Sequence, residues 1–329
     1  MLSLSADFEE GFSEFEGHVA DAERLFTEFG DPGAGIEAAI AGLDRNWALG
    51  QLNEMIERGS ALRERARRLG DGARELLVCA RLIAAAGQAG RMDLADEYQH
   101  SADDLAARLG LRQPQWGRVA RGGRLRQTGR YAEADAAFRE LREEARVEGD
   151  RLLEIAALRN RAELYIESAR DADAAPLIEE ALELSVRTGE LWNRTELTAA
   201  LGQTAAAAGD HDRAARLLRE AQAIVRATDR YAVAFVEYAA ATIADAAGRT
   251  GEADAHYRLS IDLLAKMEYR FRTALRRLHY VEFLVRAGRQ ADAEREFDLA
   301  WPLVAGFAGE GAVWVAGLRQ SLASPRSAR

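Results

Sequence analysis

The chain repeats one short pattern at an almost constant interval. The stretch "TGRYAEADAAF" at residues 128–138 returns in related form as "AGRMDLADEY", "AGDHDRAARLL", "AGRTGEADAHY" and "AGRQADAEREF". Each copy consists of a Gly-containing break, a polar pair or triplet, and an Ala that opens an amphipathic run. Self-similarity of this kind predicts one stack of similar units, because each unit buries its apolar face only against its neighbours.

The spacing of the breaks defines the unit. Successive breaks are 39 or 40 residues apart, and they begin at Gly50, Gly90, Gly129, Ala169, Gly209, Gly248 and Gly288. A second series lies between them, at "RLGDG", "RLGLRQ", "VEGD", "RTGE", "ATDR" and "KMEYR". Each unit therefore contains two helices of about 17 residues, or about 25 Å. The sequence predicts an all-α, right-handed superhelical solenoid of about seven antiparallel helical hairpins.

The composition agrees with packed helices. Hydrophobic residues make up 48% of the 329 residues, aromatic residues 7%, and there are only 5 prolines, which favours helices over sheets. Five consecutive units carry a small residue at the same point of the second helix: Ala134, Ala174, Ala214, Ala253 and Ala293. We expect these side chains to lie where two helices approach closely.

Charge and cysteine content restrict the possible partners. The net charge of −10 leaves no large basic field for direct nucleic-acid binding. The single cysteine, Cys79, rules out an intramolecular disulfide and lies in the apolar segment "ELLVCARLIAAAG", which predicts a buried, inert thiol. The acidic start lacks the pattern of a signal peptide, and no apolar run has the length of a membrane span. We expect a cytoplasmic protein that does not contact a membrane.

The repeat resembles the tetratricopeptide repeat (TPR). In "GRYAEADAAF" a Gly-polar-aromatic turn precedes an Ala and a large residue four positions later, and "ALGQTAAAAGD" carries the family's Leu-Gly pair at Leu201 and Gly202. The resemblance covers residues 35–305. Because the usual TPR unit has about 34 residues, the longer unit here is similar to the superhelical sensor regions at the C-termini of signalling ATPases and of maltose-regulator and LuxR-like transcription activators. The phosphate loop "GxxxxGK[ST]" and a basic recognition helix, which accompany those regions, are absent from this sequence.

The two ends of the chain differ from the repeats. We expect residues 1–34 to form an N-terminal helix, residues 35–305 the solenoid, residues 306–323 a C-terminal capping helix and residues 324–329 a disordered tail. The N-terminal helix has an apolar stripe with no preceding repeat to cover it, formed by Phe8, Phe12, Phe15, Val19 and Phe26. Two alternatives follow for this helix, a cap on the first hairpin or a docking element for a partner.

The resemblance to TPR proteins also implies a binding surface. In such solenoids the first helix of each hairpin lines a concave groove, which implies a set of groove residues: Asp44, Trp47, Trp116, Arg126, Arg159, Glu163, Gln203, Phe235, Tyr238, Thr242, Asp245 and Glu282. Aromatic and charged side chains together suit a peptide or a partner helix. Arg126 and Arg159 form a cationic stretch in this set, which predicts a ligand with an acidic portion and an apolar portion.

Catalytic and metal-binding patterns are missing from the sequence. The histidines are spread over different units without an "HExxH" pattern, and no serine lies in "GxSxG". We therefore expect no enzyme activity, no catalytic residues, no metal and no cofactor. The leading hypothesis is a non-catalytic scaffold that binds a protein or peptide. The alternative is the sensing region of a bacterial transcriptional or signalling regulator, responsive to a protein or a small molecule, whose effector domain is not in this chain.

Overall fold

The computed structural model describes residues 8–190, 193–227 and 229–323, and within them the chain forms sixteen α-helices and no strand. The predicted all-α fold of helical hairpins is confirmed. The predicted tail at residues 324–329 lies outside the described residues. No helix in the described part of the chain is long and apolar enough to cross a membrane.

The helices divide between two compact units, which are described separately here. Unit 1 contains residues 1–120, 227–231 and 267–269, and its helices are α1 (Phe8–Glu28), α2 (Pro32–Leu49), α3 (Leu52–Arg68), α4 (Gly72–Gln88) and α5 (Met92–Leu109). Helix α6 (Gln115–Gln127) contributes residues to both units. Unit 2 contains residues 121–226, 232–266 and 270–329, with helices α7 (Tyr131–Glu148), α8 (Arg151–Glu167), α9 (Asp171–Thr188), α10 (Arg194–Ala207), α11 (His211–Ile224), α12 (Arg230–Ala246), α13 (Thr250–Lys266), α14 (Arg270–Arg286), α15 (Gln290–Val304) and α16 (Gly309–Ala323).

The sequence breaks are the turns between these helices. All seven breaks within hairpins have a residue with positive φ: Gly50 (71°), Gly90 (76°), Gly129 (75°), Ala169 (54°), Gly209 (83°), Gly248 (72°) and Gly288 (72°). Glycine adopts this left-handed conformation without the steric cost that other residues meet. The predicted hairpin boundaries are therefore confirmed, and Ala169 is the one break where a side chain occupies the left-handed position.

Aspartates start several of the helices that follow a break. The side chains of Asp71, Asp150 and Asp210 accept hydrogen bonds of 3.0 Å from the backbone N–H groups of residues 74, 153 and 213. These amides have no partner within the helix, so each aspartate satisfies one of them and also carries charge that suits the helix N-terminus. In each "GD" pair of the sequence, the glycine thus follows the end of one helix and the aspartate caps the start of the next.

In unit 1, α1 packs against α2. Val19 is buried, and Glu23 forms an ion pair of 2.9 Å with Arg65 of α3. Near the end of α1 the apolar side chains are exposed, with Phe26 at 39% and Phe29 at 81%. The side chains of Phe8 and Phe12, which belong to the predicted apolar stripe, lie outside the described residues.

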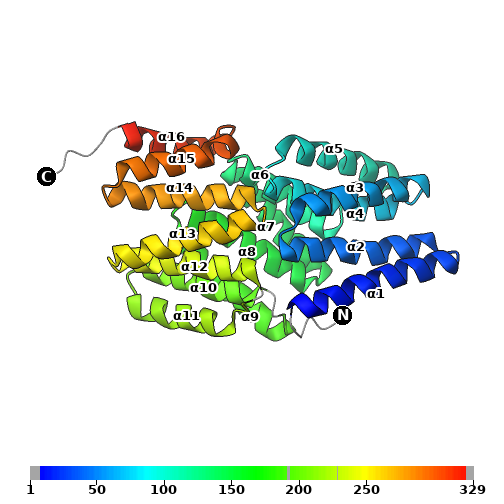
Figure 1. Ribbon diagram of the computed structural model, residues 1–329, viewed down its shortest axis with the longest axis horizontal. Coiled ribbons are helices and arrows are strands. Elements are labelled where there is room, and N and C mark those ends of the chain that lie inside the picture. The colour runs from blue at the N-terminus through cyan, green and yellow to red at the C-terminus, as the bar shows by residue number, and fades with distance from the viewer. Residues whose placement is uncertain (1–7, 191–192, 228, 324–329) are drawn as a thin grey trace. The chain divides into compact units, whose positions relative to one another are not determined.

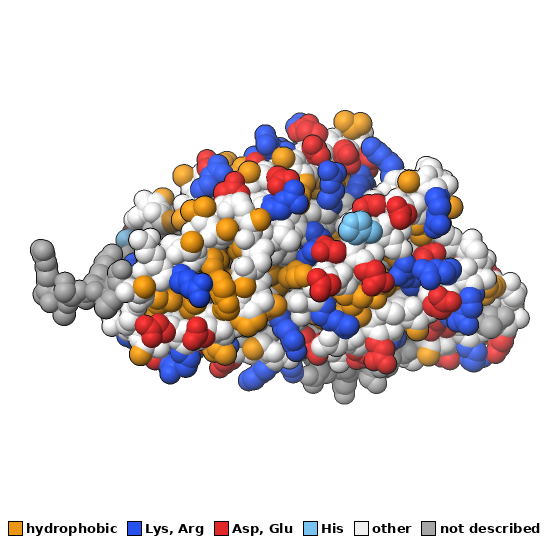
Figure 2. All heavy atoms as spheres, turned by 90° about the horizontal axis from the view of Figure 1, so that it is seen from above, with side chains coloured by type: hydrophobic (Ala, Val, Ile, Leu, Met, Phe, Trp, Pro, Cys, Tyr) orange, Lys and Arg blue, Asp and Glu red, His pale blue; other side chains and the backbone are white. Residues whose placement is uncertain are grey.

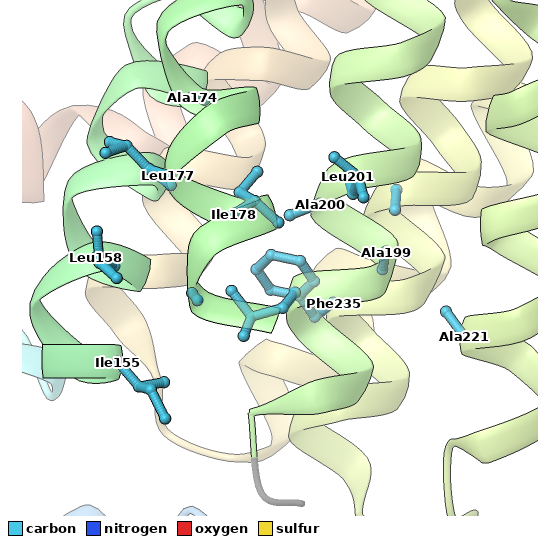
Figure 3. Packing of buried hydrophobic residues seen from close by; sticks show 14 of the residues in the cluster. Ile155, Leu158, Ala174, Leu177, Ile178, Ala199, Ala200, Leu201, Ala221 and Phe235 are labelled. Carbon is cyan, nitrogen blue, oxygen red and sulfur yellow. The ribbon is translucent and has the colours of Figure 1, made fainter. Parts of the chain in front are cut away.

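Small residues form the helix contacts of unit 2. Ala134, Ala174, Ala214, Ala253 and Ala293 are all fully buried, so their predicted packing role is confirmed. Around Ala174 a hydrophobic cluster joins α8, α9, α10 and α12, and in Figure 3 the ring of Phe235 points toward Ile178 and Ala200. Cys79, in unit 1, is also fully buried, and burial raises the pKa of its thiol to about 11.

The last helix of unit 2 packs against the turn between α6 and α7. The Ala308 N–H donates to the Thr128 carbonyl at 2.8 Å, and the Gly311 N–H donates to the Gly129 carbonyl at 2.9 Å. The Phe307 ring lies beside Tyr131, with ring centroids 6.5 Å apart. Figure 1 shows α12 to α16 side by side in chain order, and these hydrogen bonds connect the end of that row to the beginning of unit 2.

Candidate functional site

A pocket of about 780 Å³ lies within unit 2. The C-terminal parts of α8, α10, α12 and α14 form one side of it. The starts of α7 and α9, the turn at residues 168–170, Tyr257 of α13 and residues of α16 contribute the remainder. The four helices α8, α10, α12 and α14 are the first helices of successive hairpins. They run parallel to one another, so their C-terminal parts lie on the same side of the stack. The volume falls in the range of about 300–1,000 Å³ that is usual for ligand pockets.

Five of the predicted groove residues line this pocket. They are Gln203 on α10, Tyr238, Thr242 and Asp245 on α12, and Glu282 on α14. The three residues of α12 are spaced by four and three positions, which places them on one face of the helix. The pocket therefore brings together predicted groove residues that are up to 79 positions apart in the chain, from Gln203 to Glu282.

Aromatic rings form one wall of the pocket. The rings of His279 and Trp314 lie 5.0 Å apart, those of Tyr238 and His279 5.7 Å apart, and those of Tyr238 and Tyr257 6.1 Å apart. Tyr238 is 3% exposed, and the Arg276 guanidinium lies 3.6 Å from the centre of its ring. This packing holds the rings in fixed positions around the pocket.

Glu282 is held in its ionised form. Its carboxylate accepts a hydrogen bond of 2.6 Å from the Trp314 indole N–H and lies 3.5 Å from His279 Nδ1. Burial acts to raise the pKa of Glu282. The hydrogen bonds of His279 and Trp314, the charge that His279 carries when it is protonated and the charge of Arg286 outweigh burial, so the pKa is lowered. A fixed negative charge is thus present in the pocket at neutral pH.

Asp171 is the first residue of α9 and also lines the pocket. Burial raises the pKa of its carboxyl group, while the hydrogen bond from its own backbone N–H and the charge that nearby His279 carries when it is protonated act in the opposite direction. Within the described residues Asp171 forms no ion pair with an arginine. A carboxylate that loses hydration without gaining a counter-ion is energetically unfavourable.

Three buried polar atoms of the pocket have no hydrogen-bond partner among the described residues. They are Tyr131 Oη, Gln203 Oε1 and His279 Nε2, and the three side chains are 5%, 4% and 8% exposed. Since buried polar atoms in proteins are nearly always hydrogen-bonded, these atoms mark positions where a ligand can supply the missing partners.

Next to the pocket, charged side chains form a buried ion cluster. Glu163 Oε2 lies 2.9 Å from Arg126 and 2.7 Å from Arg272, Arg159 lies 3.5 Å from the other oxygen of Glu163, and Glu167 pairs with Arg126. The expectation of an open cationic stretch at Arg126 and Arg159 is therefore wrong, because both guanidinium groups pair with carboxylates of α8. This pairing was not visible in the sequence, since it depends on which helices become neighbours.

The other predicted groove residues lie elsewhere. Asp44, Trp47 and Trp116 belong to unit 1, where Asp44 pairs with Arg81 at 2.7 Å and the rings of Trp47 and Trp116 meet edge to face at 5.3 Å. Phe235 belongs to the hydrophobic cluster of unit 2 and is 5% exposed. The structure does not bring these four residues to the pocket.

Sequence reasoning missed most of the residues that line the pocket, among them Tyr131, Asp171, His279 and Trp314. Tyr131 and Asp171 are the first residues of second helices, and the resemblance placed only first helices in the groove. His279 could have been found, because it precedes the predicted Glu282 by three positions and so shares its helix face. Trp314 belongs to α16, which is outside the repeats.

The described residues contain no group of three or more His, Cys, Asp or Glu side chains arranged to hold a metal ion. Acidic and basic side chains are interspersed over the face shown in Figure 2. This distribution agrees with the many ion pairs of the structure.

Comparison with known proteins shows a shared fold. No protein-family model and no curated protein sequence matches the chain. A Rap protein solved with competence and sporulation factor is 14% identical, with a TM-score of 0.60, and the match covers 86% of this chain and 80% of that one. The Rap conjugation gene regulator of the plasmid pLS20, solved with a Phr peptide, is 13% identical, with a TM-score of 0.51 and coverage of 87% and 94%.

A third similar structure is a signal transduction ATPase with a tetratricopeptide repeat sensor from Pyrococcus horikoshii. It is 13% identical, with a TM-score of 0.50, and the match covers 92% of this chain but 45% of that protein. These likenesses confirm the predicted TPR-like solenoid fold.

Proposed function

We propose that this chain is a non-catalytic peptide-binding module whose ligand occupies the pocket of unit 2. The observation that carries the proposal is the pocket itself, which combines a fixed aromatic wall with the unpartnered polar atoms of Tyr131, Gln203 and His279. One of the similar structures was solved with a peptide. A peptide suits such a pocket because its backbone offers donors and acceptors at short intervals and its side chains cover the rings.

The alternative role, a sensing region within a larger regulator, uses the same pocket. It is supported by the likeness to the ATPase that carries a TPR sensor. The two roles differ in what is attached to the solenoid, while the ligand site of unit 2 is common to both.

Steric blocking of the pocket tests the proposal. Ala246 is exposed and lines the pocket at the end of α12, whereas Ala223 is exposed on α11 and does not line it. We suggest screening pools of synthetic hexapeptides against the full chain by thermal unfolding and measuring the best peptide by calorimetry. We expect Ala246→Trp to abolish binding and Ala223→Trp to preserve it.

The result that contradicts the proposal is equally clear. A peptide that binds wild type and Ala246→Trp with the same affinity would place the binding site outside this pocket. If no pool stabilises the wild-type protein, the ligand is not a short peptide.

A further inference from the structure

We propose that the pocket of unit 2 binds a cationic hydrogen-bond donor, an ammonium or guanidinium group of the ligand, among Asp171, Gln203 and His279. This inference rests on the proposed function, because it names the chemical group that the ligand presents to the pocket. Three independent features of the pocket support it: the orientation of its unpartnered polar atoms, its charge balance and its aromatic wall.

The unpartnered atoms of Gln203 and His279 are hydrogen-bond acceptors. The Thr242 hydroxyl donates its proton to the Ala239 carbonyl at 3.0 Å, so its oxygen can only accept from the Gln203 side chain, 3.0 Å away. Gln203 therefore directs its NH₂ group to Thr242 and leaves its carbonyl oxygen unpartnered.

The same argument applies to His279. Its Nδ1 faces the Glu282 carboxylate at 3.5 Å, which favours the tautomer with the proton on Nδ1. In the neutral imidazole Nε2 then carries a lone pair, and it has no partner among the described residues. Together with the Asp171 carboxylate, the pocket presents three acceptors to its ligand, and a complementary ligand must supply donors.

The charge balance of the pocket is negative. Each arginine that lines it already pairs with a carboxylate: Arg286 with Asp245 at 2.5 Å, Arg170 with Asp173 at 2.8 Å and Arg139 with Asp135 at 3.3 Å. Glu167 is paired with Arg126. Among the described residues Asp171, Glu282 and Glu310 form no ion pair with an arginine. A cation therefore compensates charge that the protein leaves unbalanced, whereas an anion would add to the imbalance.

The aromatic wall supports the same ligand class. The His279 and Trp314 rings lie side by side at 5.0 Å, and the electron-rich face of an indole attracts ammonium and guanidinium groups. Arg276, which contacts the Tyr238 ring, is not one of the residues that line the pocket. The pocket thus offers a carboxylate, neutral acceptors and a ring face within one enclosure.

Asp171→Asn is the variant that tests this site, and Asp212→Asn is its matched control. Each residue lies in the first turn of the second helix of a hairpin, Asp171 in α9 and Asp212 in α11, so both substitutions remove one negative charge near a helix N-terminus. Asp212 is exposed and does not line the pocket. The probes are the best hexapeptide from the screen and versions of it in which Lys is replaced by norleucine, Arg by citrulline and the free N-terminus by an acetylated one.

We expect one of these neutral replacements to weaken binding roughly tenfold to hundredfold, the usual value of a hydrogen bond to a charged group. Asp171→Asn should produce the same loss for the cationic peptide and none for its neutral version, and Asp212→Asn should bind like wild type. If charged and neutral peptides bind equally well, or if Asp171→Asn binds like wild type, the cation site is wrong while the peptide-binding function stands.

A second measurement separates this inference from the proposed function. Agmatine and n-pentylamine carry the cationic groups without a peptide, and n-pentanol is the neutral control. Because the Trp314 indole N–H donates to Glu282 in the pocket wall, its ¹⁵N resonance should shift with the two amines but not with n-pentanol. A shift without peptide binding supports the cation site and contradicts the peptide function, and the absence of any shift overturns the cation site.

Discussion

At the scale of single residues, the most constrained group of unit 2 is the carboxylate of Glu163. It is 6% exposed and contacts Arg126 of α6 and Arg272 of α14. Burial acts to raise the pKa of Glu163, but the charges of Arg272, Arg126 and Arg159 outweigh it and hold the pKa well below its usual range. The ionised carboxylate therefore links three helices that lie far apart in the chain.

Replacement of this carboxylate should destabilise the protein. We expect Glu163→Gln to reduce the free energy of unfolding by about 3–5 kcal/mol at pH 7, because it leaves buried guanidinium groups without their counter-ion. The control is Glu252→Gln, which removes an exposed ion pair with Arg249 and should cost at most about 1 kcal/mol. Urea unfolding of the three proteins gives both values.

The pH dependence of this stability has a defined sign. Because the pKa of Glu163 is lower in the folded than in the unfolded state, its contribution is complete above the unfolded value of about 4.3 and is lost as the pH falls toward the folded value. Wild type should therefore lose more stability than Glu163→Gln between pH 5 and pH 3. Equal losses over this interval would show that Glu163 does not carry a lowered pKa.

At the scale of helices, close approaches between neighbours depend on residues without a side chain. A Cβ atom at Gly122 of α6 would lie 2.5 Å from the ring of Phe138 on α7, which is fully buried. A Cβ atom at the adjacent Gly123 would meet nothing within 4 Å. Two neighbouring glycines of one helix thus differ in their packing and provide a matched pair.

The two alanine substitutions should change stability in opposite directions. Gly122→Ala should lower the free energy of unfolding by about 1–3 kcal/mol through overpacking against Phe138. Gly123→Ala should raise it by about 0.5–1 kcal/mol, because alanine is the better helix former and meets no neighbour. Thermal unfolding measures both, and a gain in stability for Gly122→Ala would show that α6 and α7 do not approach this closely.

The helices were the most predictable part of this structure, because each hairpin repeats the same local rules. Glycine at the turns, aspartate at helix starts and a fully buried Ala such as Ala214 recur in successive units. A helix boundary that is ambiguous in one unit can therefore be assigned by alignment with the other units. Even Ala169, which replaces the glycine of one turn, has φ of 54° because the spacing of the units requires a turn there.

The pocket was only partly predictable, because its residues follow no repeat. The resemblance to TPR solenoids placed Thr242 and Glu282 on the first helices that line a groove. Asp171 instead enters the pocket from the start of a second helix, and Trp314 enters it from α16. The ion pairs of Arg126 depend on the neighbouring α8. Such contacts depend on how the repeat units stack against one another. The alternation of apolar and polar residues in the sequence does not determine this stacking.

At the scale of the whole molecule, unit 2 departs from a simple linear array. In an open solenoid each repeat contacts only its neighbours, so stability spreads from one repeat to the next. Here α16 also binds the turn between α6 and α7, through hydrogen bonds that join residues 308 and 311 to residues 128 and 129. A substitution that destabilises α16 should therefore lower the local stability of the chain about 180 positions earlier, as well as that of α15.

Gly311 is the position that tests this coupling. Its Cβ atom would lie 2.5 Å from the Gly129 Cα atom, whereas a Cβ atom at Gly317 of the same helix would meet nothing within 4 Å. We expect Gly311→Ala to separate α16 from the turn and to accelerate amide hydrogen exchange at the start of α7, while Gly317→Ala leaves that exchange unchanged. If Gly311→Ala affects only α15 and α16, the contact with residues 128 and 129 does not stabilise the beginning of unit 2, and this unit behaves as an open array.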